Sequence, residues 1–348
     1  MTQQRHHRPL NILLAACALA WLPGSAFAQV QAAASPLPST ITAGIPGVVA
    51  AGTRIELIKE GFSGTEGPVA LPDGSFAFTE TQAARITRIA PDGTISTLLS
   101  DTNGANGLGF GAHGELYAVQ VQQPRVGIIY PPERAKTLVE RYEGAPFGRP
   151  NDLVVSQLGH VYFTDSGAQA PRPPQAGASA TPAPVAKADQ PAPNKPAVYR
   201  IGNDGSVKRL ANDIERPNGI QLSPDEKVLY VANTAGEYVL AYDLADDGTV
   251  GPKRNFAKLE GWRTTETGTT SSGADGLAVD ARGRLYVAST VGIQVFSPEG
   301  QPLGIIALPK APQNIAFAGP GKRTLYAVGR GAAYKIATIA SGYGGRAK

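Results

Sequence analysis

The stretch NGIQLSPDEKVLYVAN, residues 218–233, contains the pattern that decides the fold. A polar residue opens a short apolar run, a turn with Ser, Pro and Asp follows, and a second apolar run ends on a polar residue. Short alternating runs bounded by turn residues predict two antiparallel β-strands rather than a helix. Five further copies of this unit occur along the chain: EGPVALPDGSFAFTE from Glu66, NGLGFGAHGELYAVQ from Asn106, NDLVVSQLGHVYFTD from Asn151, DGLAVDARGRLYVAS from Asp275 and NIAFAGPGKRTLYAVG from Asn314.

Most copies are followed by two more strand-like runs, such as VGIIYPPE and KTLVERY after the copy from Asn106. Six repeats of four strands predict an all-β fold, a six-bladed β-propeller. The sixth repeat has room for only three strands, so we expect TRIELIK at 53–59 to complete it and close the ring. The 41 glycines and 29 prolines agree with a fold rich in turns.

Two spacings between copies are long because loops interrupt them. Residues 168–196 are rich in Pro and Ala and cannot build a core, so we expect an insertion loop between strands of the third blade. A smaller polar loop at 260–273 precedes the fifth blade. The predicted propeller spans 53–340 and is followed by a tail at 341–348.

The N-terminal residues are typical of an export signal. Two arginines precede an apolar run at 12–22, and the sequence Ala-Phe-Ala suits cleavage after Ala28. We therefore expect a signal peptide at 1–28, a flexible segment at 29–52, and a periplasmic or secreted protein. Cys17, the only cysteine, lies in the box LAAC, which leaves a lipid anchor at Cys17 as an alternative. No segment is long and apolar enough to predict a transmembrane helix.

Charge and histidine positions argue against several classes of function. The 32 Lys and Arg residues and 28 Asp and Glu residues include no basic cluster, so no nucleic-acid partner is expected. Outside the signal, the histidines are His113 and His160, each in a turn between the first two strands of a repeat. These turns lie at the far end of the strands from the opening polar residues, which disfavours a Ser-His-Asp triad and a His-bound zinc ion. A monomer is expected.

In a propeller the first strand of each blade lines the central channel, so the six opening residues should converge at one end. Two interpretations are open. Asn-Gly and Asp-Gly pairs are ordinary turn formers. A ring of carboxylate and amide oxygens also suits a hard divalent cation, first of all Ca²⁺, with Glu66 and Asp275 balancing its charge. The last residues of the second strands should form a second polar tier around the site: Glu80, Gln120, Asp165, Asn233 and Ser289.

The motifs EGPV, RPNDLVV, VYFTD, RPNGIQLSPDEKVLYVANT, GADGLAVDARGRLYVA and IQVFSPEG together resemble the gluconolactonase, senescence-marker-protein and luciferin-regenerating-enzyme family of six-bladed propellers. The resemblance covers roughly residues 60–340. It implies one divalent metal ion, Ca²⁺ or else Zn²⁺, Mn²⁺ or Fe²⁺, held by four side chains: Glu66, Asn151, Asn218 and Asp275. Asn106 and Asn314 are then left to the turn-forming interpretation.

The resemblance also implies a lactone hydrolase, in which the metal polarises the carbonyl group and activates water. Asp275 is the expected base, and Arg149, which precedes PND, is expected to hold the substrate. Ala70 stands where the family often has an aromatic residue, which predicts a roomier pocket wall. The other residues assigned to the substrate pocket are Asp152, Asp165 and Asn106.

Three functions stay open on the sequence. The first is an exported lactonase that acts on a small-molecule lactone such as gluconolactone. The second is a metal-dependent hydrolase of other esters or organophosphates, which a substrate panel would separate from the first. The third is a propeller that binds a ligand or partner protein without catalysis, its metal only stapling the channel; inactivity together with a metal-dependent melting shift would indicate it.

Overall fold

A computed structural model describes residues 1–2, 40–168, 191–264, 268–346 and 348. Residues Ser35–Lys348 form one compact unit, distinct from Met1–Ala34. The expected signal peptide at 1–28 and most of the expected insertion at 168–196 lie outside the described residues. Within the part of the chain that the structure describes, no helix is long and apolar enough to cross a membrane.

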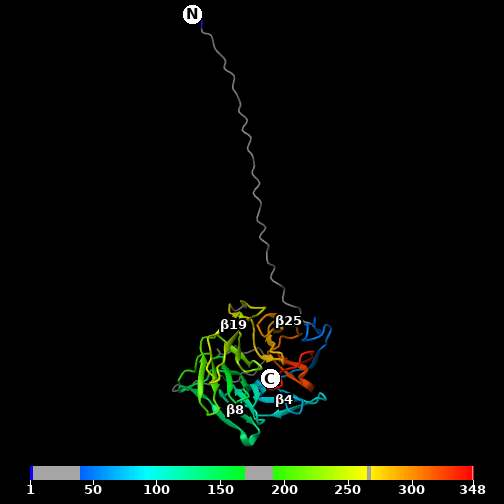
Figure 1. Ribbon diagram of the computed structural model, residues 1–348, viewed down its shortest axis with the longest axis vertical. Coiled ribbons are helices and arrows are strands. Elements are labelled where there is room, and N and C mark those ends of the chain that lie inside the picture. The colour runs from blue at the N-terminus through cyan, green and yellow to red at the C-terminus, as the bar shows by residue number, and fades with distance from the viewer. Residues whose placement is uncertain (3–39, 169–190, 265–267, 347) are drawn as a thin grey trace, which may run out of the picture. The chain divides into compact units, whose positions relative to one another are not determined.

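Six four-stranded antiparallel sheets form a six-bladed β-propeller, which confirms the predicted fold (Figure 1). In blades one to five the strands run outward from the channel in chain order, and in blade six β26, β27 and β28 are followed by the N-terminal strand β1. Blades one to three are β2 (Thr65–Ala70), β3 (Phe76–Glu80), β4 (Arg85–Ile89) and β5 (Ile95–Leu99); β6 (Ala105–Phe110), β7 (Leu116–Gln120), β8 (Arg125–Tyr130) and β9 (Lys136–Val139); and β12 (Pro150–Val155), β13 (Val161–Asp165), β14 (Ala197–Ile201) and β15 (Val207–Ala211). Blades four to six are β16 (Pro217–Leu222), β17 (Val228–Asn233), β18 (Tyr238–Asp243) and β19 (Arg254–Lys258); β22 (Leu277–Val279), β23 (Leu285–Ser289), β24 (Gly292–Phe296) and β25 (Pro302–Ile306); and β26 (Asn314–Ala318), β27 (Thr324–Gly329), β28 (Ala332–Ala337) and β1 (Ile55–Glu60).

The ring closes through the N-terminal strand, as expected from TRIELIK. Strand β1 pairs antiparallel with β28, and the register places Ile55 opposite Ile336 and Glu60 opposite Ala332. The sixth blade is therefore built from both ends of the propeller sequence. The innermost strands β2, β6, β12, β16, β22 and β26 each contact the next around the channel, and β26 contacts β2.

The hydrophobic core lies mainly between neighbouring blades. One cluster joins Val119 and Val126 of blade two to Phe163 and Tyr199 of blade three. The rings of Phe147, Phe163 and Tyr199 pack with centroids 5.1 to 5.3 Å apart. Full burial of each such side chain stabilises the fold by roughly 1.5–3 kcal/mol, so the interblade seams fix the ring of inner strands.

The described part of the segment expected to be flexible, residues 40–52, is packed instead. Ile45, Val48 and Val49 are buried in the cluster that joins blades five and six. The Thr42 hydroxyl donates a 2.6 Å hydrogen bond to the Ala50 carbonyl, which closes the segment on itself. Its apolar side chains cover the core between blades five and six. The sequence did not predict this packing because the segment is short and has no strand periodicity.

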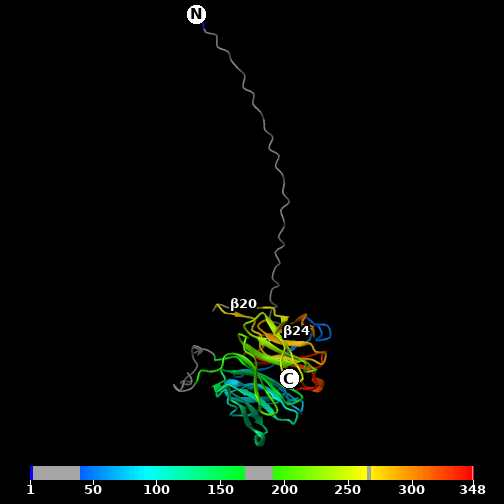
Figure 2. The same ribbon diagram turned by 60° about the vertical axis from the view of Figure 1, so that its left-hand side comes forward.

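The interrupting loops lie where the spacings predicted them. The 168–196 insertion joins β13 to β14, the second and third strands of blade three, with 169–190 outside the described residues. The loop before blade five carries a small hairpin, β20 (Arg263–Thr264) with β21 (Thr270–Ser271), which Figure 2 shows at one margin of the ring of sheets. A second hairpin, β10 (Arg141–Tyr142) with β11 (Ala145–Pro146), precedes blade three.

Candidate functional site

The six opening residues occupy one level of the innermost strands. In strands β2, β6, β12 and β16 the opening residue is the second residue of the strand: Glu66, Asn106, Asn151 and Asn218. Asn314 is the first residue of β26, and Asp275 precedes β22. In these four blades the pairing with the second strand shifts register immediately after this level. The resulting β-bulges turn the side chains at this level relative to the regular pleat, a common device beside functional sites.

Four of the six opening residues are followed by a glycine, and a close approach between blades, not a turn, requires it. A Cβ at position 219 would lie 2.1 Å from the Asp275 carbonyl oxygen, and one at position 276 would lie 1.9 Å from Asn314 Oδ1. Among the described opening pairs only Gly67 has a positive φ, at 45°. The interpretation of these Asn-Gly and Asp-Gly pairs as left-handed turn formers is therefore wrong, because the neighbouring blade leaves no room for a Cβ at these glycines.

Asp152 stands where most blades have that glycine, and its side chain lies inside the channel. The residue is 1% exposed. Its Oδ1 accepts a 2.8 Å hydrogen bond from the Leu153 amide, and its Oδ2 forms an ion pair with the Lys348 ammonium. A Cβ at position 107 would meet Asp152 Oδ1 at 2.4 Å, so Gly107 makes room for this carboxylate.

Three carboxyl groups from three blades meet in this space. Burial, and then the Asp152 charge, raise the pKa of Glu66 to about 7 against the lowering effects of Asn314, Arg149 and Lys348. Burial, then Glu66 and Asp152, raise the pKa of Asp275 well above its usual value. Asp275 as a whole residue is half-buried, but its Oδ1 is buried from solvent, so desolvation acts on the carboxylate itself. The mutual repulsion places Glu66, Asp152 and Asp275 within electrostatic reach of one another.

Two oxygens of the predicted ligand set are buried without a hydrogen-bond partner among the described residues. They are Asn218 Oδ1 and Asp275 Oδ1. The Asn218 amide is oriented by its Nδ2, which donates a 3.0 Å hydrogen bond to Thr234 Oγ1. An acceptor buried without a partner costs roughly 1–3 kcal/mol, so this arrangement fits a group that supplies positive charge at that point.

The two remaining predicted ligands make only long contacts through their side-chain oxygens. Asn151 Oδ1 lies 3.5 Å from Asn106 Nδ2, and the Glu66 oxygens lie 3.2 Å from Gln313 Nε2 and 3.3 Å from Asn314 Nδ2. Together Glu66, Asn151, Asn218 and Asp275 offer oxygen donors alone, which suits a hard cation. In the described ranges no three His, Cys, Asp or Glu side chains form a cluster that could hold a metal ion, and this set has two carboxylates and two amides.

Asn106 and Asn314 link neighbouring blades rather than forming turns. Asn106 Nδ2 donates a 2.8 Å hydrogen bond to the Asn151 carbonyl, and its Oδ1 accepts one of 3.0 Å from Thr81 Oγ1. Asn314 Oδ1 accepts a 2.9 Å hydrogen bond from the Ile315 amide while its Nδ2 faces Glu66. Both polar ends of each amide are in use, so these two residues orient predicted ligands. A substrate contact by Asn106 stays a prediction.

Asp165 holds the loop that carries Arg149. Its carboxylate accepts hydrogen bonds of 2.8, 2.6 and 2.9 Å from the amides of Gly148, Arg149 and Gly167. Burial raises the pKa of Asp165, and these three amides oppose the rise. The Arg149 charge lowers the pKa of Glu66, so its guanidinium acts on the carboxyl cluster. These contacts give Asp165 a structural role, and a direct contact with substrate stays a prediction.

The predicted second polar tier has the same structural role in other blades. Glu80 accepts a 2.8 Å hydrogen bond from the Ser63 amide, and Asn233 accepts one of 3.1 Å from the Arg216 amide. In both cases the end of the second strand fixes the loop that leads into the first. Gln120 and Ser289 instead donate hydrogen bonds of 3.1 and 2.9 Å to the carbonyls of Thr102 and Gly292. All five residues of the tier are therefore bonded to the backbone.

The histidines and Ala70 lie away from the site. His113 and His160 lie in the turns that join β6 to β7 and β12 to β13, as predicted. His160 is half-buried, with Nε2 3.0 Å from Arg200 Nη2, and burial followed by the Arg200 charge lowers its pKa. Ala70 is the last residue of β2 and lines a cavity of about 400 Å³ at the far end of the channel. The expectation that Ala70 widens the substrate pocket is wrong, because Glu66 lies at the opposite end of the same strand.

Sequence reasoning missed three residues at this site, two threonines and a lysine. The hydroxyl of Thr234 orients Asn218, and the Thr164 hydroxyl donates a 2.5 Å hydrogen bond to the Asn218 carbonyl. Both threonines interrupt or follow apolar strands near the site, in VYFTD and YVANT, which is a usable signal. Lys348, whose side chain is 2% exposed, had no such signal because it lies in a tail without periodicity.

Comparisons with known proteins agree with this architecture. The family model described as SMP-30/Gluconolactonase/LRE-like region matches residues 64–329. A gluconolactonase from Zymomonas mobilis subsp. mobilis is 29% identical over 295 residues, which cover 79% of this chain and 78% of that protein. The solved structure of a gluconolactonase from Xanthomonas campestris is 27% identical with a TM-score of 0.68, covering 87% of this chain and 95% of that one. A calcium-binding regucalcin from Agrobacterium tumefaciens shares the fold, with a TM-score of 0.65, 16% identity, and coverage of 84% and 95%. The chain belongs to the SMP-30/gluconolactonase/LRE-like family.

Proposed function

We propose that this protein is a metal-dependent lactone hydrolase whose substrate is a sugar lactone of the gluconolactone type. The observation that carries the proposal is the pair of buried, unpartnered oxygens, Asn218 Oδ1 and Asp275 Oδ1, beside the Glu66 carboxyl group. The gluconolactonase relative aligns over 79% of the chain, which supports the reaction class. The channel position, the donor chemistry and the family relationship point to the same site.

Glu66, Asn151, Asn218 and Asp275 would hold one divalent cation. Their oxygen donors favour Ca²⁺, with Mn²⁺, Fe²⁺ or Zn²⁺ as alternatives that a titration would separate. When bound, such an ion polarises a carbonyl oxygen and lowers the pKa of water, which is the chemistry that ester hydrolysis needs. It would also remove the cost of leaving the two buried oxygens unpartnered.

Asp275 is the proposed base. A nearby positive charge favours the carboxylate over the protonated form, which leaves Asp275 able to take a proton. The oxygen of a water molecule attacks the lactone carbonyl carbon, and Asp275 accepts the proton that this water loses. The ring C–O bond then breaks, the ring oxygen takes up the proton, and the product is the open hydroxy acid.

Arg149 is proposed to hold the substrate. Asp165 accepts a hydrogen bond from the Arg149 amide, which fixes the backbone that carries this side chain. A guanidinium offers several donors in a planar fork, which suits the carbonyl and hydroxyl oxygens of a sugar lactone. Asp152 is paired with Lys348 and orders the site from within the channel.

The test is hydrolysis of D-glucono-1,5-lactone near pH 6.5, followed by acid release. The mature protein is treated with a chelator and then supplied separately with Ca²⁺, Mn²⁺, Fe²⁺ or Zn²⁺. We expect activity to vanish and to return with one ion. Asp275→Asn should remain inactive, whereas Asp92→Asn, a change in an exposed turn carboxylate, should retain full activity.

Other outcomes of this test separate the alternative functions. If the cation binds and raises the melting temperature but no lactone or ester is hydrolysed, the metal is structural and the protein is not a hydrolase of these substrates. If simple esters or organophosphates are hydrolysed but lactones are not, the proposed metal site and base are retained and only the substrate assignment is wrong. Full activity of Asp275→Asn would refute the assigned base.

We further propose that the protein is exported and monomeric. The arginines and apolar run before Ala28 support export, and the proposal needs a mature chain that begins at Gln29. N-terminal sequencing of protein from the periplasm or the medium tests this. A lipid-modified Cys17 in the membrane fraction would refute it, and light scattering of the purified chain tests the monomer.

A further inference from the structure

The C-terminal tail enters the central channel from the end opposite the candidate metal site. The chain end marked C lies within the ring of sheets in Figure 1. The tail leaves blade six beside blade five, where Gly342 bridges to Asp280 and the Tyr343 amide donates a 3.1 Å hydrogen bond to the Val279 carbonyl. It then continues toward the turns of blades three and four.

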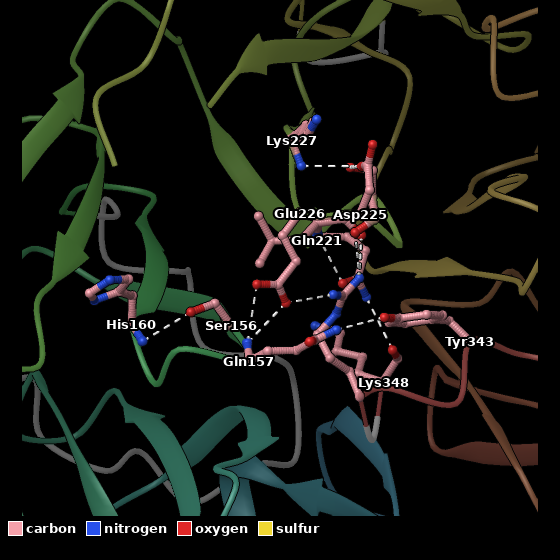
Figure 3. A network of polar contacts seen from close by, with 12 residues as sticks. Ser156, Gln157, His160, Gln221, Asp225, Glu226, Lys227, Tyr343 and Lys348 are labelled. Carbon is pink, nitrogen blue, oxygen red and sulfur yellow. Dashed lines mark hydrogen bonds and ion pairs between the residues drawn. The ribbon is translucent and has the colours of Figure 1, made fainter. Parts of the chain in front are cut away.

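Polar contacts anchor the tail to these turns (Figure 3). Gln157 Nε2 donates a 2.7 Å hydrogen bond to the Tyr343 hydroxyl, and the Gln157 amide donates to both Glu226 oxygens at 2.9 and 3.1 Å. Arg346 Nη1 pairs with Glu226 Oε1 at 2.9 Å. Its Nη2 donates to the carbonyls of Leu222 and Ser223 at 2.6 and 3.0 Å. The Arg346 side chain is 4% exposed, so these bonds are buried and fix the tail in place.

This anchoring carries Lys348 to the carboxyl cluster. Its ammonium forms an ion pair with Asp152 Oδ2, and the two side chains are 2% and 1% exposed. Gln221 Nε2, on strand β16, lies 3.4 Å from the Lys348 carbonyl oxygen. A buried ammonium is stable only when paired, so the tail holds a fixed positive charge on Asp152, the residue that follows the proposed ligand Asn151.

The charges at the site explain what this ammonium does. Glu66, Asp152 and Asp275 would together carry three negative charges. Pairing Asp152 with Lys348 leaves two, Glu66 and Asp275, which match a divalent cation. The ion pair occupies Oδ2 of Asp152, which adjoins the predicted ligand Asn151, and its Oδ1 accepts a hydrogen bond from the Leu153 amide.

We propose that Lys348 is a positioning residue that sets the charge and ligand number of the metal site by neutralising Asp152 from within the channel. This inference rests on the proposed metal-dependent function. Without the ammonium, Asp152 adds a third negative charge and binds the cation too tightly, and the extra charge weakens polarisation of the substrate carbonyl.

The experiment measures Ca²⁺ binding by calorimetry and lactone hydrolysis in the full chain and four variants. Lys348→Met should lower the Kd for Ca²⁺ about tenfold and lower kcat, whereas Asp152→Asn should raise the Kd about tenfold. The double variant Asp152→Asn/Lys348→Met should return near the wild-type Kd. Lys335→Met, which removes an exposed ammonium paired with Glu56 on the outer strand, is the matched control and should change neither quantity.

The variants distinguish a tail that only fills the channel from a Lys348 that neutralises Asp152. If the tail only filled the channel, the single variants would lower the melting temperature without moving the Kd in opposite directions, and that result would overturn the inference. If Lys348→Met does not fold, Asp152→Asn and the double variant decide, and Lys348→Arg should retain the wild-type Kd. If the wild-type chain binds no divalent cation, the proposed function and this inference are both overturned. If the wild-type chain binds the cation and the variants have the same Kd, this inference alone is overturned.

Discussion

The hydroxyl of Thr234 supports the proposed metal site through two buried hydrogen bonds. It accepts one of 3.0 Å from Asn218 Nδ2 and donates one of 2.8 Å to the Ala274 carbonyl, next to Asp275. Thr234→Val keeps the shape of the side chain and removes both bonds. Each bond contributes about 1 kcal/mol, and each partner left buried without one costs roughly 1–3 kcal/mol, so we expect a loss of about 2–4 kcal/mol in the free energy of unfolding.

The same change should weaken cation binding, because the Asn218 amide loses the contact that aims its oxygen. We expect the Kd for Ca²⁺ to rise about tenfold, which corresponds to about 1.4 kcal/mol. Urea unfolding of the chelated protein and calorimetric titration with Ca²⁺ measure the two effects. Thr234→Ser keeps the hydroxyl and should retain the wild-type Kd. A Thr234→Val protein with wild-type stability and wild-type Kd would refute the assignment of Asn218 as an oriented ligand.

Three further predictions concern the same site. Gly276→Ala places a Cβ 1.9 Å from Asn314 Oδ1 and should destabilise the fold by about 1–3 kcal/mol, a result that urea unfolding checks and an unchanged midpoint would contradict. Because the pKa of Glu66 rises from 4.5 to about 7, the folded metal-free protein binds more protons than the unfolded chain in that range, so its stability should fall as pH rises from 4.5 to 7. In the same range Ca²⁺ should bind more tightly as pH rises and should release protons, which calorimetry in two buffers detects; binding without proton release would count against Glu66 as a ligand. Arg149→Lys keeps the charge but not the planar fork, and should raise KM for the lactone about tenfold with a smaller change in kcat, whereas an unchanged KM would remove Arg149 from the substrate site.

The repeated strand pattern made most of the fold predictable. Alternating runs after Glu66, Asn151 and Asn218 report local strand geometry, and six copies leave little choice but a closed ring. The place of TRIELIK followed from counting strands in the last blade. Convergence of the opening residues followed from propeller geometry, since every innermost strand starts at the same end.

The rest depended on contacts between segments far apart in the sequence. The glycines after the opening residues resembled turn formers, because the sequence cannot show that a neighbouring blade lies within 2 Å of a Cβ at position 276. The sequence assigned Asp165 to the pocket but could not show the three backbone amides that its carboxylate holds. Lys348 lies in a segment that is held by two carboxylates, Glu226 and Asp152, and by backbone carbonyls of blades four and five, so no periodicity marks it.

The central claim is that the oxygens of Glu66, Asn151, Asn218 and Asp275 hold the cation that lactone hydrolysis requires. The most direct measurement titrates Ca²⁺ into the chelated protein and records, on the same samples, ion occupancy and the initial rate of D-glucono-1,5-lactone opening. The account predicts one ion per chain and a rate that rises in proportion to occupancy from a negligible starting value. Full activity in the chelated protein, or a saturated site without hydrolysis, would contradict it.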